Sequence, residues 1–530
     1  MIKRNLFLSI LFVAFLVFLL VILFQPPAYA DEVGTRAGEK YVGSDECQSC
    51  HPLSYDGWNS TRHPRAWDTL NNSGSKIEAC EVCHVTGYGL TGQDGFDRVT
   101  DLPVAMQGTQ CEACHGPGED HIVGPDTNPL EVSLSALVCG ATCHQEEHHP
   151  YYEEWNQSGH AISLVALKGA AGAAEDSCLA CHSVDYFFDD TTTLDTAEYS
   201  ITCSRCHDPH TSDYPNQLRM PADELCAECH NPSGALPGDP ISHPQSSMRE
   251  GRSGAPILGE SFMPDVVCAD CHVYMNKQTN VTGHSFTPKV EACVECHTST
   301  PPIYSNDTAQ VQITEWKTQT WTKVIDVQAL VVLAGKAIDD APEYGFSEST
   351  IDLARELHEQ ANYSLTFVVA DGSGGSHNPV FAQQLLGFAE NKSNEIIGLL
   401  TPGMVVGRVI DESGNPVEGV VVVIDGMTMA TTESNGTFSF SFAPGTHSFN
   451  LKLKGDLVGS VDMVTVQSQQ TTDIGDVTIT EESLFIPLMM AVLVILLLVA
   501  LVIFMFYRMQ KITPKKSKEE IPEPEEEEET

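Results

Sequence analysis

Cysteine and histidine recur in one pattern along the N-terminal half of the sequence. Two cysteines are separated by two residues and the second is followed directly by histidine, which is the attachment signature of c-type haem. The thiols bond covalently to the porphyrin, and the histidine is held beneath the iron as its proximal ligand. Eight repetitions with a histidine each time argue against tetrahedral zinc sites. The eight motifs are Cys47, Cys50 and His51; Cys80, Cys83 and His84; Cys111, Cys114 and His115; Cys178, Cys181 and His182; Cys203, Cys206 and His207; Cys226, Cys229 and His230; Cys268, Cys271 and His272; Cys293, Cys296 and His297.

A ninth site has one extra residue between its cysteines, in the string Cys139-Gly-Ala-Thr-Cys143-His144. The alternative for this pair is two free thiols or a disulfide in a degenerate motif. We predict haem attachment, because His144 follows directly and the site opens the second copy of a repeat. All 18 cysteines of the chain are then used. The sequence therefore predicts nine covalent haem c groups.

The sixth iron position of an electron carrier is usually closed by a second strong ligand, most often histidine. Of the adjacent His148 and His149, we expect one to bind; His148 is the candidate, and the choice stays open. His377 precedes a predicted helix, and its alternative is a helix-entry turn residue. His358 and His447 are expected to be ordinary residues. The predicted distal ligands are His63, His121, His148, His160, His210, His243, His284 and His377.

An internal repeat supports part of this assignment. The segment Trp58–His63 reappears as Trp155–His160, each copy lying between two Cys-His pairs, and its tryptophan is expected to pack against a haem. His121 and His210 each follow a third pair. A module of three haem motifs is therefore duplicated, and residues 226–297 are interpreted as a diverged third copy. The repeat predicts that His63 and His160 are equivalent ligands.

Four blocks follow residues 1–30 and must position these residues; the fourth is the apolar run 484–507 with the tail after it. Residues 31–300 are rich in Cys, His, Gly and Pro and have few periodic stretches, which predicts a mostly α-helical and irregular domain packed around haem. Residues 301–402 have helical patterning at Val324–Ile338, Thr350–Glu359 and Pro379–Ala389. Residues 403–480 change to short β-rich runs broken by turns, which predicts a small β-sandwich. The predicted strands are Val405–Ile410, Val420–Ile424, Thr437–Phe442 and His447–Leu453.

Both ends of the sequence have membrane signals. Residues 1–30 combine a basic start, the apolar run Leu6–Phe24 and an Ala-x-Ala site, which indicates a secretory signal peptide; an uncleaved signal anchor is the alternative. The run Leu484–Tyr507 has no charged residue and is long enough for a transmembrane helix. Basic residues follow it, which predicts a cytoplasmic tail at 508–530 and an extracytoplasmic haem domain. Eight Asn-x-Ser/Thr sequons are compatible with surface glycosylation and with an archaeal cell surface.

The charge balance is strongly acidic, with 28 Lys and Arg against 72 Asp and Glu and a net charge of −44. Such a surface repels nucleic acid and anionic lipid and favours basic partners. We therefore exclude nucleic-acid binding.

The haem-motif residues resemble the multihaem cytochrome superfamily that includes cytochrome c-554, hydroxylamine oxidoreductase and pentahaem nitrite reductase. The matching stretches are Tyr41–His51, Cys83–Tyr88 and Cys111–His121, and Asp371–Leu386 is similar to the C-terminal helical part of such proteins. The resemblance implies haems that stack in close pairs and form a conductive chain. Residues 403–480 resemble a carboxypeptidase regulatory-like β-sandwich through Val406-Gly-Arg-Val and Gly414-Asn-Pro-Val-Glu-Gly. We interpret that domain as a spacer that lifts the haem domain off the membrane.

The sequence departs from the enzymatic members of that superfamily. Pentahaem nitrite reductases typically bind substrate at a haem whose motif ends in Lys, whereas all nine motifs here end in His. No tyrosine can be assigned to the crosslink of the catalytic haem of hydroxylamine oxidoreductase. Both departures weaken an enzymatic interpretation and leave a five-coordinate haem open.

We therefore expect a membrane-anchored cytochrome that transfers electrons through mostly bis-histidine haems, including extracellular electron transfer. Its expected partners are other redox proteins, other cytochromes or membrane quinone-linked complexes. The alternative is an oxidoreductase that acts on a small nitrogen or sulfur compound at one open haem. A third interpretation, an adhesin in which haem is structural, is supported only by the β domain.

Overall fold

The computed structural model describes most of the chain between residues 40 and 510. The predicted signal peptide, His148 and residues 511–530 lie outside the described residues. The chain divides into two compact units: one holds residues up to Val332 together with Leu357–Ser393, and the other holds Leu333–Glu356 and the chain from Asn394 onward. The described ranges are 40–88, 102–130, 132–140, 143–145, 149–170, 172–231, 241–252, 257–276, 278–299, 301–480 and 485–510.

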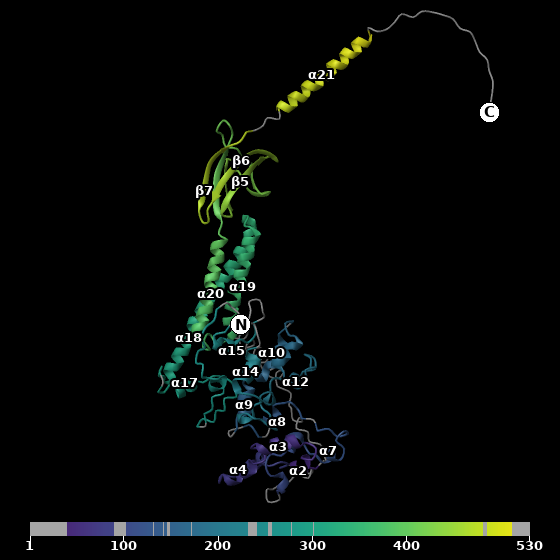
Figure 1. Cartoon of the computed structure of the whole chain (residues 1–530), viewed down its shortest axis with the longest axis vertical. Helices are drawn as coiled ribbons and strands as arrows, with labels where there is room; N and C mark the ends of the chain where they lie inside the picture. The colour runs from purple at the N-terminus through teal and green to yellow at the C-terminus, as the bar shows by residue number, and fades with distance from the viewer. Residues whose placement is uncertain are drawn as a thin grey trace, which may run out of the picture. The chain divides into compact units, whose positions relative to one another are not determined.

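The described residues between 41 and 299 form short helices joined by irregular segments (Figure 1), as the sequence predicts. The longest described helices here have nine residues, and each of the nine cysteine motifs overlaps an α-helix. The α-helices are α2 (Ser44–Cys47), α3 (Pro52–Ser60), α4 (Ala66–Asn72), α5 (Glu78–His84), α6 (Glu112–His115), α7 (Glu119–Val123), α8 (Leu137–Gly140), α9 (Tyr151–Asn156), α10 (Ser163–Gly169), α11 (Leu179–His182), α12 (Val184–Phe188), α13 (Cys203–Cys206), α14 (Ala222–His230), α15 (Gln245–Glu250), α16 (Cys268–His272) and α17 (Val290–Cys296). The 3₁₀ helices are η2 (Val104–Met106), η3 (His160–Ile162), η4 (Asp176–Cys178) and η5 (Pro215–Gln217).

Three long helices follow: α18 (Asn306–Asp340), α19 (Glu348–Asp371) and α20 (Pro379–Leu399). Each contains one of the predicted helical segments and extends beyond it. The 3₁₀ helix η6 (Ala341–Tyr344) lies between the first two.

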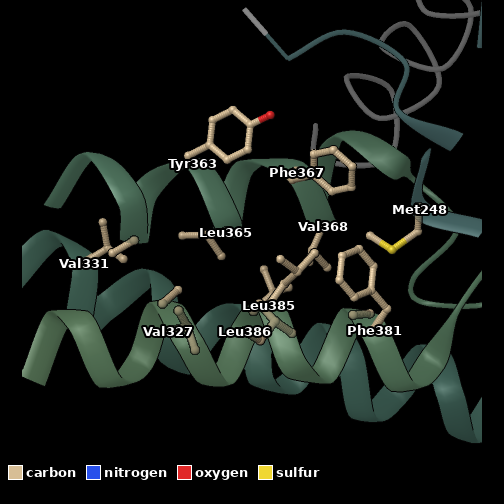
Figure 2. Close-up of a cluster of buried hydrophobic side chains, with 14 residues drawn as sticks. Met248, Val327, Val331, Tyr363, Leu365, Phe367, Val368, Phe381, Leu385 and Leu386 are labelled. Carbon is tan, nitrogen blue, oxygen red and sulfur yellow. The ribbon is translucent and has the colours of Figure 1, made fainter. Parts of the chain in front are cut away.

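The three helices pack through a core that includes one residue of the haem region. Val327, Leu365 and Leu385 represent α18, α19 and α20 in this core, and Met248 of α15 is fully buried in it. Figure 2 shows Met248 beside Phe381 of α20. Gly259 also lies against Phe381, since a Cβ at Gly259 would be 2.5 Å from that ring. The haem region and these parts of the helices therefore form one packed unit.

The β domain is a sandwich of two sheets, as its sequence predicts. One sheet has the order β4-β1-β7, with β1 antiparallel to β4 and parallel to β7; the other has the antiparallel order β3-β2-β5-β6. Residues from both sheets form one apolar core around Phe449 and Phe440. The strands are β1 (Gly403–Ile410), β2 (Val421–Ile424), β3 (Met427–Thr431), β4 (Thr437–Phe442), β5 (Gly445–Leu453), β6 (Asp456–Val466) and β7 (Thr471–Thr478).

After the strands comes α21 (Phe485–Gln510), whose side chains from Val492 to Met505 are apolar and exposed. Within the part of the chain that the structure describes with its side chains, no helix is long and apolar enough to cross a membrane.

Candidate haem-binding sites

The nine cysteine motifs are numbered 1 to 9 in chain order, so that copy 1 of the repeat holds motifs 1–3, copy 2 motifs 4–6 and copy 3 motifs 7–9. A helical turn puts residues i, i+3 and i+4 on one face, so both thiols and the histidine of a motif face the same side. In motif 1 the amide of His51 donates to the carbonyl of Cys47 at 2.9 Å, and His115 donates to Cys111 at 3.0 Å in motif 3. None of the 18 cysteines forms a disulfide.

Motif 4 accommodates its extra residue without losing this bond. The amide of His144 donates to the carbonyl of Cys139 at 3.1 Å, although five residues rather than four separate them. A bond from an amide to the carbonyl five residues earlier is the i→i+5 bond, one residue longer than the α-helical bond. The fourth motif therefore keeps the relation between its first cysteine and its histidine that the other motifs have.

Seven proximal histidines face a second histidine ring at nearly constant distance. A metal ion between two imidazoles takes a nitrogen at about 2 Å on each side. With the half-width of each ring added, centroids about 6 Å apart leave room for one ion, so the donor set fits a haem iron with two axial histidines. The centroid distances are 6.2 Å for His51 and His121, 6.0 Å for His115 and His210, 6.4 Å for His144 and His63, 5.8 Å for His182 and His243, 6.3 Å for His207 and His284, 6.2 Å for His230 and His160, and 6.0 Å for His272 and His377.

Two further ring contacts leave a choice of partner. His243 lies 5.9 Å from His230 as well as 5.8 Å from His182. Because His160 already faces His230, His243 is available for His182. His149 lies 6.1 Å from His144, which His63 also faces.

Burial keeps several of these rings neutral. It lowers the pKa of His115, His144 and His160 to about 4, and neighbouring histidines add to the effect. The pKa values of His63 and His284 are also lowered, mainly by burial. A histidine binds a metal in its neutral form, so these rings are ready to ligate at neutral pH.

Hydrogen bonds at equivalent positions of copies 1 and 2 agree with the repeat predicted from the sequence. Trp58 Nε1 donates to the carbonyl of Thr109 at 3.0 Å, and Trp155 Nε1 donates to that of Ile201 at 2.9 Å. Each acceptor lies two residues before the third motif of its copy. The Nδ1 atoms of the second-motif histidines also have matching carbonyl partners: His84 with Ala66 at 2.7 Å and His182 with Ser163 at 3.0 Å.

Contacts between thiols show which motifs lie side by side. In copies 1 and 2 the first motif contacts the third motif of its own copy, and the second motif contacts the first motif of the next copy. In copy 3 the first motif, motif 7, contacts motif 8. In this contact motif 8 corresponds to the third motif of the other two copies. The contacting thiols are Cys47 with Cys111, Cys139 with Cys203, Cys83 with Cys143, Cys181 with Cys229, and Cys226 with Cys268.

The histidine pairs follow the same order. First motifs 4 and 7 face His63 and His160, which belong to the preceding copies. Third-position motifs 3 and 6 face His210 and His284, which belong to the following copies. Motif 1 has no preceding copy and faces His121 of its own copy instead. His63 and His160 are therefore equivalent in position. His121 and His210 are not, because His121 faces a first motif and His210 faces a third motif.

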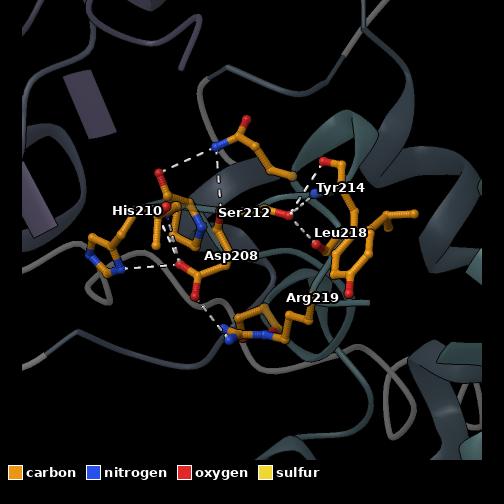
Figure 3. Close-up of polar contacts among 10 residues, drawn as sticks. Asp208, His210, Ser212, Tyr214, Leu218 and Arg219 are labelled. Atoms are coloured by element: carbon orange, nitrogen blue, oxygen red, sulfur yellow. Dashed lines mark hydrogen bonds and ion pairs between the residues drawn. The ribbon is translucent and has the colours of Figure 1, made fainter. Parts of the chain in front are cut away.

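Acidic side chains fix two of the segments that bear distal histidines. Glu154 of α9 accepts the amides of Thr282 and His284 at 2.9 and 2.8 Å, which ties copy 3 to copy 2. Asp208 accepts the amide of His210 at 2.9 Å and pairs with Arg219 at 3.1 Å (Figure 3). The sequence analysis did not identify Glu154 and Asp208 as residues that fix the distal histidines. Acidic residues are numerous in this region, and the spacing of these two does not distinguish them.

His377 reaches motif 8 from the loop between α19 and α20. Asn378 Nδ2 donates to the carbonyl of Glu260 at 2.9 Å, which fixes the loop to the haem region. Gly374 and Gly375 have positive φ values of 64° and 84°. A Cβ at Gly375 would lie 2.5 Å from Thr320 Oγ1 of α18, so the loop needs glycine there.

The remaining histidines lie as follows. Among the described residues, no ring contact joins His84 of motif 2 to a second histidine. His297 of motif 9 lies 5.3 Å from the ring of Tyr304. His358 contacts the carbonyl of Val331 at 3.1 Å and His447 that of Ala443 at 2.9 Å, so both have structural partners.

Comparison with known proteins gives four family matches along the chain. Residues 46–116 match cytochrome c554 and c-prime, 197–235 match the doubled CXXCH motif, 259–401 match cytochrome c552 and 404–480 match the carboxypeptidase regulatory-like domain.

Relatives of the haem region are also cytochromes. Cytochrome c-554 of Nitrosomonas europaea is 31% identical over 164 residues, covering 28% of this chain and 59% of that protein. The multiheme cytochrome MtrA of Shewanella baltica is 29% identical over 189 residues, covering 33% of this chain and 51% of that protein. The chain thus spans little more than half the length of these relatives. The solved structure of the outer cell wall cytochrome OcwA shares the fold, with a TM-score of 0.52 and 23% identity over 67% of this chain and 99% of that one.

The cysteine motifs and these matches agree on one cofactor, haem c bound through paired thiols. Motifs 1–3, motifs 6 and 7, and motifs 8 and 9 lie in three successive family matches, and the β domain lies in a fourth. Together the motifs and the matches identify a multihaem c-type cytochrome with a carboxypeptidase regulatory-like domain after its haem region.

Proposed function

We propose that this cytochrome transfers electrons along a row of haems, most of them bound by two histidines. The observation that supports this best is the set of seven histidine pairs with centroids 5.8 to 6.4 Å apart. Haem c supplies a one-electron couple between ferric and ferrous iron. When histidine rings occupy both axial faces, no position is left for a substrate, so the site can only accept and pass on electrons.

The proposed row of haems follows the order of the repeat copies, because thiols and histidines of neighbouring copies are in contact. Second motifs contact the first motif of the next copy through their thiols, as Cys83 does with Cys143 and Cys181 with Cys229. Distal histidines also cross between copies, as His63 and His284 do. These contacts between copies support a path on which electrons pass from one copy to the next.

Electron paramagnetic resonance of the oxidised protein tests this function. We expect low-spin ferric signals from the seven haems whose histidine pairs the structure describes. A dominant high-spin signal that shifts on addition of nitrite or hydroxylamine would instead support the oxidoreductase acting at an open haem.

We also propose nine haems in each chain. The supporting observation is the hydrogen bond from the amide of His144 to the carbonyl of Cys139 in motif 4. Intact mass of the holoprotein decides the number. A mass that accounts for eight haems, with Cys139 and Cys143 unmodified, would refute attachment at motif 4.

The proposed location is the outer face of the cytoplasmic membrane, with the anchor at 484–507. The support is the uncharged apolar sequence of that segment and the basic residues after it. Protease added to spheroplasts should remove the haem region and spare an epitope tag fused to residue 530. Protection of the haem region with loss of the tag would refute this orientation.

A basic redox protein is the proposed partner, because the chain has a net charge of −44. Electron exchange with such a partner should slow steeply as ionic strength rises. A rate independent of salt would argue against this choice.

A further inference from the structure

His377 differs from most of the other described distal histidines in the partner of its ring nitrogen. Its Nδ1 lies 2.6 Å from Oδ1 of Asp371, whose side chain is fully buried. His210 Nδ1 also faces a carboxylate, Oδ1 of Asp208, but at the longer distance of 3.4 Å. The corresponding atom of His121 contacts the carbonyl of Asn128 at 2.9 Å, and that of His243 contacts the hydroxyl of Ser242 at 2.8 Å. A buried carboxylate at this distance is a stronger acceptor than a carbonyl or a hydroxyl.

The loop structure holds Asp371 in this place. Ser373 donates to the other carboxylate oxygen through both its hydroxyl and its amide. Gln245 donates to the carbonyl of Asp371 at 3.1 Å, while its Oε1 contacts His230 Nδ1 of motif 7 at 3.3 Å. Asp371 therefore has a fixed orientation and is connected to the neighbouring motif.

A carboxylate that accepts the ring N–H of an axial histidine makes that histidine a stronger donor to iron. Stronger donation stabilises ferric more than ferrous iron and lowers the reduction potential. We propose, on the basis of the ligation proposed above, that Asp371 lowers the reduction potential of the haem held by His272 and His377. Asp371 is thus a positioning residue that acts on the iron through His377.

The consequence concerns the step between motifs 7 and 8. Their thiols Cys226 and Cys268 are in contact, so these haems are neighbours in the row. A lowered potential at motif 8 would make its haem harder to reduce than the haem at motif 7. Asp371 therefore controls how electrons divide between motif 7 and the haems beyond it.

Redox titration of the purified holoprotein, followed by visible and electron paramagnetic resonance spectra, tests the proposal. A His377→Met variant first marks the signal of the motif 8 haem, because methionine changes its ligand class. In Asp371→Asn the amide oxygen can still accept the N–H but the charge is lost. We expect that same signal to move to a more positive potential, with its g-values changed and all haems retained by mass.

Asp208→Asn is the matched control. Asp208 contacts the ring of His210 at 3.4 Å, and Arg219 already balances its charge, so the haem at motif 3 should shift less. Ser373→Ala removes a donor to Asp371, which leaves more charge on the oxygen facing His377 and should shift motif 8 in the negative direction. This second variant tests the proposal even if Asp371→Asn does not fold.

The outcomes separate the two proposals. If His377→Met changes no haem spectrum, His377 is not a ligand and the proposed ligation fails at motif 8. If His377→Met changes one haem, but neither Asp371→Asn nor Ser373→Ala moves its potential, ligation stands and the role of Asp371 is refuted. Equal shifts in Asp371→Asn and Asp208→Asn would also refute a specific role.

Discussion

In the β domain, thirteen buried residues from both sheets form one apolar core. In the described part of the haem region, clusters around Trp67 and Leu164 have four buried residues each. The β domain thus has enough apolar contact to define its own fold, whereas the haem region is organised by covalent motifs and histidine pairs. We infer that haem takes the place of a large hydrophobic core in this region, and that its folded state therefore depends on the cofactor.

The largest expected effect is that of withholding haem. When the full chain is produced in cells without haem-attachment machinery, we expect residues 41–299 to be degraded quickly while 403–480 remain resistant. Limited proteolysis followed by mass spectrometry measures this. A haem-free chain whose haem region stays as resistant as in the holoprotein would remove the contrast between the two regions.

A core substitution in the β domain should have the opposite pattern. Phe449 is fully buried and packs on Phe440 with ring centroids 5.5 Å apart. Phe449→Ala should destabilise this domain by about 3–5 kcal/mol and leave the haem spectra unchanged. Denaturant unfolding followed by protease resistance of residues 403–480 measures it.

Met463→Ala, on an exposed side chain of β6, is the control and should change stability by less than about 0.5 kcal/mol. A loss of haem signal in Phe449→Ala would show that the two regions fold together.

Replacing a distal histidine should alter redox chemistry more than stability. In His63→Met and His160→Met the thioethers and the proximal histidine remain, so attachment should persist. Methionine is a weaker donor to ferric iron, so the potential should rise at the haem of His144 in the first variant and of His230 in the second. Redox titration of each variant measures the shift.

His149→Gln is the control for this pair of variants. If it changes the haem of His144 while His63→Met does not, then His149 is the ligand and the equivalence of His63 and His160 is wrong.

The smallest effect is expected from the repeated tryptophans. Trp58→Phe and Trp155→Phe each remove one hydrogen bond to a carbonyl and should each cost about 0.5–1.5 kcal/mol. The two costs should be similar, because both bonds hold the chain before a third motif. Thermal unfolding of the holoprotein measures them; a several-fold difference would show that the two copies are held together differently.

Much of the β domain could be predicted from its alternating pattern. The four predicted strands correspond to β1, β2, β4 and β5, and three strands, β3, β6 and β7, were missed. All three lie at sheet edges. Edge strands bury fewer side chains than central ones; in β7 (Thr471–Thr478), for example, every side chain is exposed or only half-buried. The hydrophobic period is therefore weak there.

The sequence alone located the paired cysteines and histidines at which haem attachment is proposed, because eight of the nine motifs place two thiols and a histidine within five residues, on one helical turn. It also determined the repeat, and it identified as candidate ligands the seven distal histidines that the structure places opposite a proximal ring. Which histidine faces which motif was decided only by the tertiary structure. His63 and His144 are 81 positions apart, and His272 and His377 are 105 apart. Such pairs depend on how the copies pack, as does the contact of Asp371 with His377, which forms only when the loop after α19 is fixed against α15.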